Sequence, residues 1–278
     1  MNAERFSQIE VEQEMREALE QQAFLAFYQP CVDLVTGEVV AIEALARWQH
    51  KRRGLLNPHD FLALAGQAGL VAEIDAQVQR SALQQAAAWR EAGSELLLSI
   101  NCSSVQIESA DFLPKFESMC AEAGYPLDRL QLEITEQTLV RQVKSAASNI
   151  QSLRAKGVRV AIDDFGMGYS SLTYLREFPV DVLKIDRTFI QDIQTLDQAR
   201  VGVSLADAII AMAKSLGLAL IAEGVEYPAQ ISYLRQQACD TAQGFLFSEP
   251  CNAAQMQGLL DKGSFAHLLA AAPPIEKS

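Results

Sequence analysis

The sequence is poor in the residues that build disulfide frameworks and zinc centres. Of its 278 residues, 5 are cysteines and 3 are histidines. The cysteine number is odd, and the cysteines are scattered without any C-x-x-C pair, so we interpret them as reduced packing residues of a cytoplasmic protein. They are Cys31, Cys102, Cys120, Cys239 and Cys251.

Long hydrophobic runs and an excess of basic residues are also absent. Polar residues interrupt every apolar run before it reaches the length of a membrane span, and the N-terminus MNAERFSQIEVEQEM is acidic rather than signal-like. We therefore expect no membrane contact. Lysine and arginine number 23 against 35 acids, which gives a net charge of -12. That charge argues against duplex nucleic acid as a partner, and a small phosphorylated ligand would need local cations.

What the chain does contain is a regular alternation of extended and helical patterns, with 49% hydrophobic residues, which is ample for a sizeable core. The alternation predicts a (β/α) barrel, with an open doubly wound sheet as the alternative. Helices are expected at 58–68, after the N-cap Asn57, and at about 74–92. The segments expected to be extended are 24–34, 39–48, 96–101, 130–135, 158–163, 180–186, 218–223 and 241–247.

We expect one barrel domain at residues 23–268. Residues 1–22 contain an acidic amphipathic helix, expected at about 8–22, which either lies on the domain or is the end of a linker from an upstream domain. Residues 269–278 include Pro273-Pro274 and are expected to form a disordered tail.

Two adjacent carboxylates mark the segment around which the candidate site is organised. Val160 and Ile162 indicate a buried strand, and Asp163 and Asp164 follow at its end, before a glycine-rich turn. Aspartate is common in turns because it forms local hydrogen bonds, so this pair alone leaves a structural role open. Adjacent carboxylates nevertheless repel each other unless a cation lies between them.

Other predicted strands also end in polar residues. Successive residues of a strand point to opposite faces, so in most strands the aliphatic side chains would meet the helices and the polar ones the barrel axis. The polar side chains then converge near the carboxyl ends of the strands, where barrel active sites lie. They are Glu43, Asn101, Glu133, Asp163, Lys184, Glu223 and Gln243.

This set is dominated by oxygen ligands and lacks histidine, which favours Mg²⁺ or Mn²⁺ over zinc or copper. His50, His59 and His267 lie away from the strand ends, and we interpret them as surface or helix residues. The adjacent Asp163 and Asp164 suit two ions about 4 Å apart, as used for in-line displacement at phosphorus. Caps or ion pairs would explain any single acid, but burying the whole set without cations costs several kcal/mol per charge. The predicted reaction is phosphoester hydrolysis.

These residues stand in motifs by which the chain resembles the EAL-domain family of cyclic di-GMP phosphodiesterases over about residues 28–250. The motifs are Tyr28-Gln29-Pro30, Glu43-Ala44-Leu45-Ala46-Arg47-Trp48, Asn101, Leu132-Glu133-Ile134-Thr135-Glu136, Asp163-Asp164-Phe165-Gly166, Leu183-Lys184-Ile185-Asp186, Ala222-Glu223-Gly224-Val225-Glu226, and Gln243-Gly244-Phe245 ahead of Pro250.

The resemblance implies a modified TIM-type (β/α) barrel with one antiparallel early strand. It implies hydrolysis of cyclic di-GMP to linear pGpG with two Mg²⁺ or Mn²⁺ ions per site. It also implies a homodimer through the loop and helix that follow Asp164.

Roles for individual residues follow from the same resemblance. Implied ligands are Glu43, Asn101, Glu133 and Asp163 for one ion and Asp163, Asp164 and Glu223 for the second. Implied catalytic residues are Lys184, which would hold the attacking water, Glu223 as base or ligand, and Glu43. Implied substrate contacts are Gln29, Leu45, Arg47, Asp186 and Gln243, while Glu136 would stabilise the loop after Asp164.

The chain departs from the family pattern at two places. Met167 stands where the family usually has threonine, and Ala65-Gly66 where it commonly has Ala-Glu. Neither change removes an implied metal ligand, but the first lies in the loop most closely tied to regulation.

Two other functions stay open. One is a catalytically silent receptor for cyclic di-GMP, although such receptors typically have lost acidic ligands that are all present here. The other is a barrel enzyme that abstracts a proton beside a carboxylate, in which metal-binding acids and a strand-end lysine also occur. The Asp163-Asp164 pair and Arg47 favour a phosphate substrate.

Overall fold

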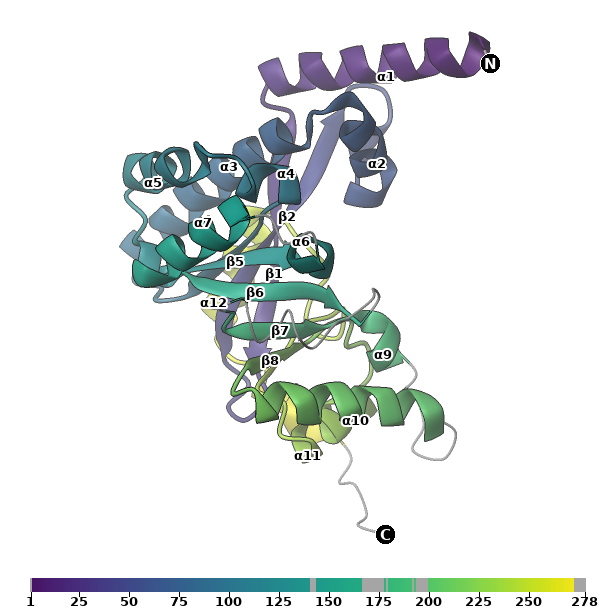
Figure 1. Cartoon of the computed structure of the whole chain (residues 1–278). Coiled ribbons are helices and arrows are strands. Elements are labelled where there is room, and N and C mark those ends of the chain that lie inside the picture. The colour runs from purple at the N-terminus through teal and green to yellow at the C-terminus, as the bar shows by residue number, and fades with distance from the viewer. Residues whose placement is uncertain are drawn as a thin grey trace.

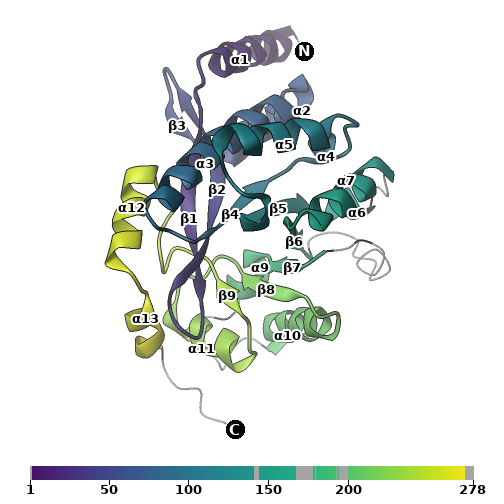
Figure 2. The same cartoon turned by 90° about the vertical axis from the view of Figure 1, so that its left-hand side faces the viewer.

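A closed ring of strands surrounded by helices forms the centre of the protein (Figures 1 and 2). The computed structural model describes residues 2–140, 144–166, 178, 180–191, 193 and 200–272. Around the ring the strands follow the order β1 (Phe24–Asp33), β9 (Thr241–Ala242), β8 (Ala219–Ala222), β7 (Val182–Ile185), β6 (Arg159–Phe165), β5 (Leu130–Thr135), β4 (Leu97–Asn101) and β2 (Val39–His50). Strand β2 pairs again with β1 and closes the ring. The short strand β3 (Gly54–Leu56) pairs with β2 outside it.

Strand β1 runs antiparallel to both of its neighbours, β2 and β9. The other pairs of the ring are parallel. A short turn can join only antiparallel strands, and Asp33 shapes the turn between β1 and β2 by accepting hydrogen bonds from the Val35 and Thr36 amides at 2.9 and 2.7 Å. The prediction of a barrel with one antiparallel early strand is confirmed.

Helices lie around the ring. They are α1 (Asn2–Glu20), α2 (Pro58–Ala68), α3 (Val71–Glu91), α4 (Ser104–Ile107), α5 (Phe112–Ala123), α6 (Glu136–Val140), α7 (Lys144–Ala155), α9 (Arg187–Gln191), α10 (Arg200–Ser215), α11 (Pro228–Gln236), α12 (Ala253–Lys262) and α13 (Ala266–Ala271), with a 3₁₀ turn at Leu127–Arg129. Helix α1 lies across one end of the molecule beside α2 (Figure 1). Within the described ranges, no helix combines the length and apolar character needed to cross a membrane.

Buried apolar residues form two clusters, one on the outer face of the strands and one on the inner face. The large cluster packs outward-facing residues such as Ile42, Leu132 and Leu183 against the helices. A small cluster holds Cys31, Ala41, Ala161, Val182 and Ile221. In β2, β6 and β7, and at the end of β8, a charged residue follows two positions after a member of this small cluster, so it points to the same face. Small apolar side chains therefore support the layer of charged residues.

Three details differ from the predicted elements. The last ring strand ends at Ala242 rather than at residue 247, because the chain turns there: the Val225 amide donates to the Gln243 carbonyl at 3.0 Å, and a Cβ on Gly244 would lie 2.1 Å from the Val225 oxygen. The first helix spans Asn2–Glu20 rather than about 8–22, and Gln22 after it has φ 53°. Strand β3 was not predicted.

Candidate active site

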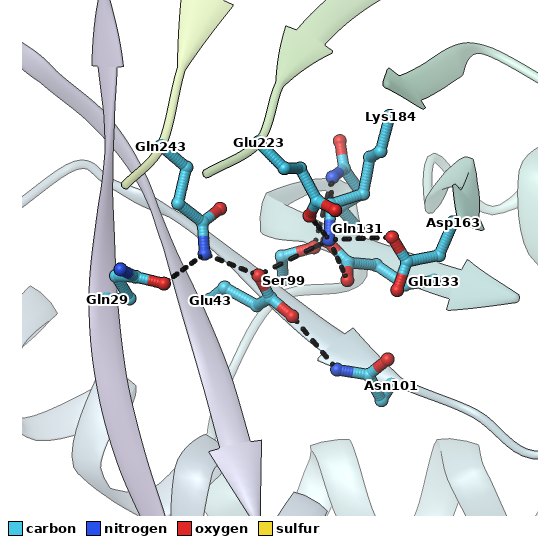
Figure 3. A network of polar contacts seen from close by, with 10 residues as sticks. All are labelled: Gln29, Glu43, Ser99, Asn101, Gln131, Glu133, Asp163, Lys184, Glu223 and Gln243. Atoms are coloured by element: carbon cyan, nitrogen blue, oxygen red, sulfur yellow. Dashed lines mark hydrogen bonds and ion pairs between the residues drawn. The ribbon is translucent and has the colours of Figure 1, made fainter. Parts of the chain in front are cut away.

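Lys184 on β7 is the centre of a buried cluster of acids (Figure 3). Its side chain is 1% exposed. Its Nζ lies 2.7 Å from Glu133 Oε2 and from Glu223 Oε1, 3.2 Å from Asp163 Oδ1 and 3.3 Å from Glu43 Oε2. Four carboxylates from four parts of the ring thus share one ammonium group, which leaves an excess of negative charge when all are ionised.

Glu43 on β2 is held by two amide side chains, from the ends of β4 and β9. Asn101 Nδ2 donates to its Oε1 at 3.1 Å, and Gln243 Nε2 donates to its Oε2 at 2.6 Å. Gln243 also donates to Gln29 Oε1 at 2.8 Å, and Gln29 donates to the Ser248 carbonyl at 2.9 Å. This chain of hydrogen bonds fixes the Glu43 carboxylate at the mouth of the barrel.

A second group of acids opens toward solvent. Asp163, Asp164 and Glu223 each offer an oxygen, and these oxygens lie within 4.8 Å of one another. Asp164 has a left-handed backbone with φ 52°, which is uncommon for a residue other than glycine. The unusual conformation reverses the side-chain alternation, so that Asp164 can join Asp163 on the same side.

The electrostatics of the cluster follow from burial and crowding. Burial, and then the neighbouring Asp163, raise the pKa of the Asp164 carboxyl to about 6. Burial raises the pKa of Glu223 to about 8. Burial and the nearby Glu43 also raise the pKa of Glu133 well above its ordinary value. Burial opposes the charge on Lys184, but the surrounding carboxylates outweigh it and raise the pKa of the ammonium.

The residues present fit a hard divalent cation. Asp163 Oδ1 is buried without a hydrogen-bond partner in the described part of the chain, its nearest cation being Lys184 Nζ. An orphaned buried carboxylate oxygen beside two further acids is a site at which a cation removes an energetic penalty. The oxygen donors favour Mg²⁺ or Mn²⁺. Such an ion supplies charge neutralisation and activation of water or phosphate oxygens.

A cleft of about 800 Å³ lies above the acids. Arg47 reaches it from β2, with its guanidinium 5.5 Å from the centre of the Phe27 ring and its Nη1 donating to the Ala46 carbonyl at 2.7 Å. The predicted site residues that line this cleft are Gln29, Glu43, Leu45, Arg47, Asp163, Asp164, Asp186, Glu223 and Gln243. Asn101 and Lys184 contact Glu43, and Glu133 contacts Lys184; these three residues are not among those lining the cleft.

Two predicted site residues accept hydrogen bonds from backbone amides next to the site. Glu136 Oε2 accepts a hydrogen bond from the Gly166 amide at 3.1 Å, so it contacts the segment directly after Asp164. Asp186 Oδ1 accepts hydrogen bonds from the Thr188 amide at 2.8 Å and hydroxyl at 2.5 Å, which caps the start of α9. Met167 and the rest of the loop and helix predicted to form a dimer contact lie outside the described residues.

The prediction that the histidines are surface or helix residues is wrong for His50, which is a buried residue of strand β2. His59 on α2 and His267 on α13 are exposed helix residues, as predicted. His50 is 4% exposed and its Nε2 lies 3.3 Å from Glu14 Oε2 on α1. His59 is exposed and pairs with Asp60 at 3.1 Å, but it also lies at the rim of the cleft.

Sequence reasoning missed four residues of the site. Ser99 and Gln131 are buried against Glu133, and Arg187 and the 58% exposed Phe245 line the cleft. Strand alternation already placed Ser99 and Gln131 on the inner face, but it gave no reason to select them. Arg187 carried a signal too, since it follows Asp186 in a recognised motif.

Known proteins share this architecture. The EAL domain family model matches residues 12–250. The cyclic di-GMP phosphodiesterase NbdA of Pseudomonas aeruginosa is 39% identical over 96% of this chain and 34% of its own length. The cyclic di-GMP phosphodiesterase PdeR of Escherichia coli is 35% identical over 92% of this chain and 38% of its own length.

A solved structure, the PaMucR phosphodiesterase in complex with c-di-GMP, superposes with a TM-score of 0.82 at 35% identity. The superposition covers 89% of this chain and 99% of that one. The chain spans little more than a third of the length of the two curated relatives named above. With the family match extending over most of its residues, the chain belongs to the EAL domain family.

Proposed function

We propose that this chain hydrolyses cyclic di-GMP to linear pGpG in a metal-dependent reaction of bacterial second-messenger signalling. One observation carries the proposal: the predicted metal-binding acids and amides and Lys184 gather at one open cleft. Support comes from relatives named cyclic di-GMP phosphodiesterases and from the c-di-GMP complex of the PaMucR phosphodiesterase.

In the proposed site, Glu43, Asn101, Glu133 and Asp163 hold one Mg²⁺ or Mn²⁺ ion, and Asp163, Asp164 and Glu223 hold a second. The geometry that supports this division is the approach of the three last-named carboxylates to within 4.8 Å. Bound there, two divalent cations would balance the negative charge around Lys184 and so favour a phosphodiester in the cleft.

The chemical step replaces one phosphodiester bond. The oxygen of a water attacks phosphorus and the bond from phosphorus to the 3′ oxygen breaks. The departing oxygen takes up a proton and becomes the 3′ hydroxyl of pGpG, whose 5′ phosphate carries the new oxygen. Lys184 orients the water, which takes the place of one of the two longer contacts of Nζ, those to Asp163 and Glu43. Glu223, whose Oε1 lies 2.7 Å from Lys184 Nζ, would accept the proton of that water in its ionised form.

The rim of the cleft binds the substrate. Arg47 grips one phosphate, because a guanidinium can donate two parallel hydrogen bonds to phosphate oxygens. Gln29, Leu45, Asp186 and Gln243 line the nucleotide cleft around it. Glu136 stabilises the segment after Asp164 through the Gly166 amide.

We also propose a homodimer through the loop and helix after Asp164, and a cytoplasmic location. The five cysteines are free and four of them are buried, which fits a reducing compartment. Sedimentation of the purified protein with and without cyclic di-GMP tests the dimer.

Hydrolysis is tested by incubating the protein with cyclic di-GMP and Mg²⁺ or Mn²⁺ and following pGpG by chromatography. We expect product with metal and none after chelation. Glu43→Gln keeps the size of the side chain but removes a charged ligand, so hydrolysis should fall by orders of magnitude while ligand binding survives through Arg47. The exposed Glu38→Gln, in the turn before the same strand, should leave both unchanged. A wild type that binds the dinucleotide yet cleaves it with neither metal is a receptor and contradicts the proposal.

A further inference from the structure

Two polar side chains are buried inside the barrel next to Glu133, each two residues before a site residue of its own strand. Ser99 on β4 is 3% exposed and Gln131 on β5 is 2% exposed. They are register partners in the parallel pair β4–β5, and Asn101 and Glu133 are the register partners two residues further on. Ser99 and Gln131 therefore point to the same side as those two site residues.

The hydrogen bonds run in one direction, toward Glu133. Gln131 Nε2 donates to Ser99 Oγ at 3.0 Å, and Ser99 Oγ donates to Glu133 Oε1 at 2.5 Å (Figure 3). Gln131 Nε2 also lies 3.4 Å from the same Glu133 oxygen. A serine hydroxyl has one proton, and the incoming N–H occupies an oxygen lone pair, so Gln131 directs that proton at Glu133.

Ser99 and Gln131 both bond to one oxygen of Glu133 and leave its other oxygen for the site. Glu133 Oε2 lies 2.7 Å from Lys184 Nζ, while Ser99 Oγ and Gln131 Nε2 both donate to Oε1. Pairing at both oxygens sets the plane of the carboxylate. The neighbouring inner positions Ala161 and Val182 are apolar, and burying an amide and a hydroxyl there would be costly unless they served a partner.

We propose that Ser99 and Gln131 are positioning residues that hold Glu133 in the orientation in which it binds a divalent cation. Ser99 makes the direct bond, and Gln131 acts mainly through Ser99. This inference rests on the metal site of the proposed function. Carboxylate ligands in metal sites are themselves hydrogen-bonded, and loss of such outer partners commonly lowers metal affinity about 10- to 100-fold.

The test measures Mn²⁺ binding by calorimetry on chelator-stripped protein without substrate. Ser99→Ala should weaken binding about 10- to 100-fold, and hydrolysis should need a correspondingly higher Mn²⁺ concentration to reach half of its maximal rate. Ser99→Thr retains the hydroxyl and should restore most of the affinity. Gln131→Leu should weaken binding less than Ser99→Ala, and the double variant should be only slightly weaker than Ser99→Ala alone, because Gln131 acts mainly through Ser99 and its direct bond to Glu133 is long.

Asn149→Leu is the control for general damage. Asn149 is a buried amide that donates to the Ile107 and Ser109 carbonyls, away from Glu133. It should lower the melting temperature without changing Mn²⁺ affinity. If Ser99→Ala is unstable, Gln131→Leu still gives the comparison.

The measurements distinguish failure of the positioning role from failure of the hydrolase. Unchanged Mn²⁺ affinity in Ser99→Ala or additive losses in the double variant would overturn the positioning role alone. A wild type that binds Mn²⁺ without cleaving cyclic di-GMP would overturn the hydrolase but leave the positioning role to be decided by the affinities. A wild type without Mn²⁺ binding would overturn both.

Discussion

The acids of the candidate site divide into an inner pair, Glu43 and Glu133, and an outer group, Asp163, Asp164 and Glu223. The side chains of the inner pair are 5% and 1% exposed, against 16% for Asp163 and 18% for Glu223. Both oxygens of each inner carboxylate are paired with a hydroxyl, amide or ammonium of the protein. By contrast, Asp163 Oδ1 has no hydrogen bond from the described residues.

The difference shows two ways of keeping carboxylates close together. The protein itself satisfies the inner pair, whose positions are set before any ligand arrives. The outer group is incomplete, because its members crowd one another and share Lys184 with the inner pair. We infer that a bound cation contributes most at the outer group, where the protein supplies least.

Removing the ammonium group of Lys184, which contacts both groups of acids, should give the largest effect. Lys184→Met keeps the length of the side chain but leaves the surrounding carboxylates without an ammonium. Breaking a buried ion pair commonly costs about 3–5 kcal/mol, so we expect a large fall in the free energy of unfolding and hydrolysis lowered by orders of magnitude. Denaturant unfolding and the pGpG assay measure the two.

Arg154→Met is the matched control for Lys184→Met. Arg154 pairs with Asp181 in a half-buried contact outside the site, with Nε 3.0 Å from Oδ2. This variant should be less destabilised and should hydrolyse cyclic di-GMP at the wild-type rate. Equal effects of the two substitutions would refute the special place of Lys184.

The outer group should also make the metal-free protein sensitive to pH. The pKa values of Glu223 and Asp164 are raised to about 8 and about 6, from 4.5 and 3.8. Between the pKa of each group in the unfolded chain and its raised pKa in the folded state, the folded protein holds a proton that the unfolded chain has released. The free energy of unfolding therefore falls as pH rises and levels off above about pH 8. Thermal melts of chelated protein across this range measure the slope, and Glu223→Gln should flatten its upper part.

Added Mn²⁺ should reverse this dependence, because a metal binds the ionised carboxylates. The rise in melting temperature should therefore be larger at pH 8 than at pH 6. A chelated protein that becomes more stable from pH 5 to pH 8, with Glu223→Gln showing the same slope, would contradict the raised pKa of the outer group.

The sequence predicted the inner and outer acids from strand alternation, because the side to which Glu43 or Asp163 points depends only on position in a regular strand. Alternation did not place Asp164 beside Asp163. That pairing was predicted from the adjacency of the two acids and from the family resemblance, and it depends on the left-handed backbone of Asp164. Nor did alternation identify Ser99 and Gln131 as partners of Glu133, because it fixes a face but not a hydrogen bond.

For the fold, too, local patterns in the sequence predicted some features and missed others. Periodicity predicted the ring, and the family motifs predicted the antiparallel strand. The length of the last ring strand was wrong, because the close approach of Gly244 to the Val225 backbone ends β9, and these residues are distant in sequence. Contacts between remote segments leave no local pattern.

The smallest effect is expected at Met167, which follows the outer group in sequence and lies outside the described residues. A threonine there would offer a hydroxyl that methionine lacks, and one hydrogen bond contributes roughly 0.5–1.5 kcal/mol. We therefore expect an active wild type, and a rate or metal requirement of Met167→Thr within about tenfold of it. Hydrolysis is compared at saturating Mg²⁺ and at saturating Mn²⁺, with dimerisation followed in parallel. A wild type that binds cyclic di-GMP without cleaving it, beside a Met167→Thr variant that cleaves it, would show instead that this position silences a receptor.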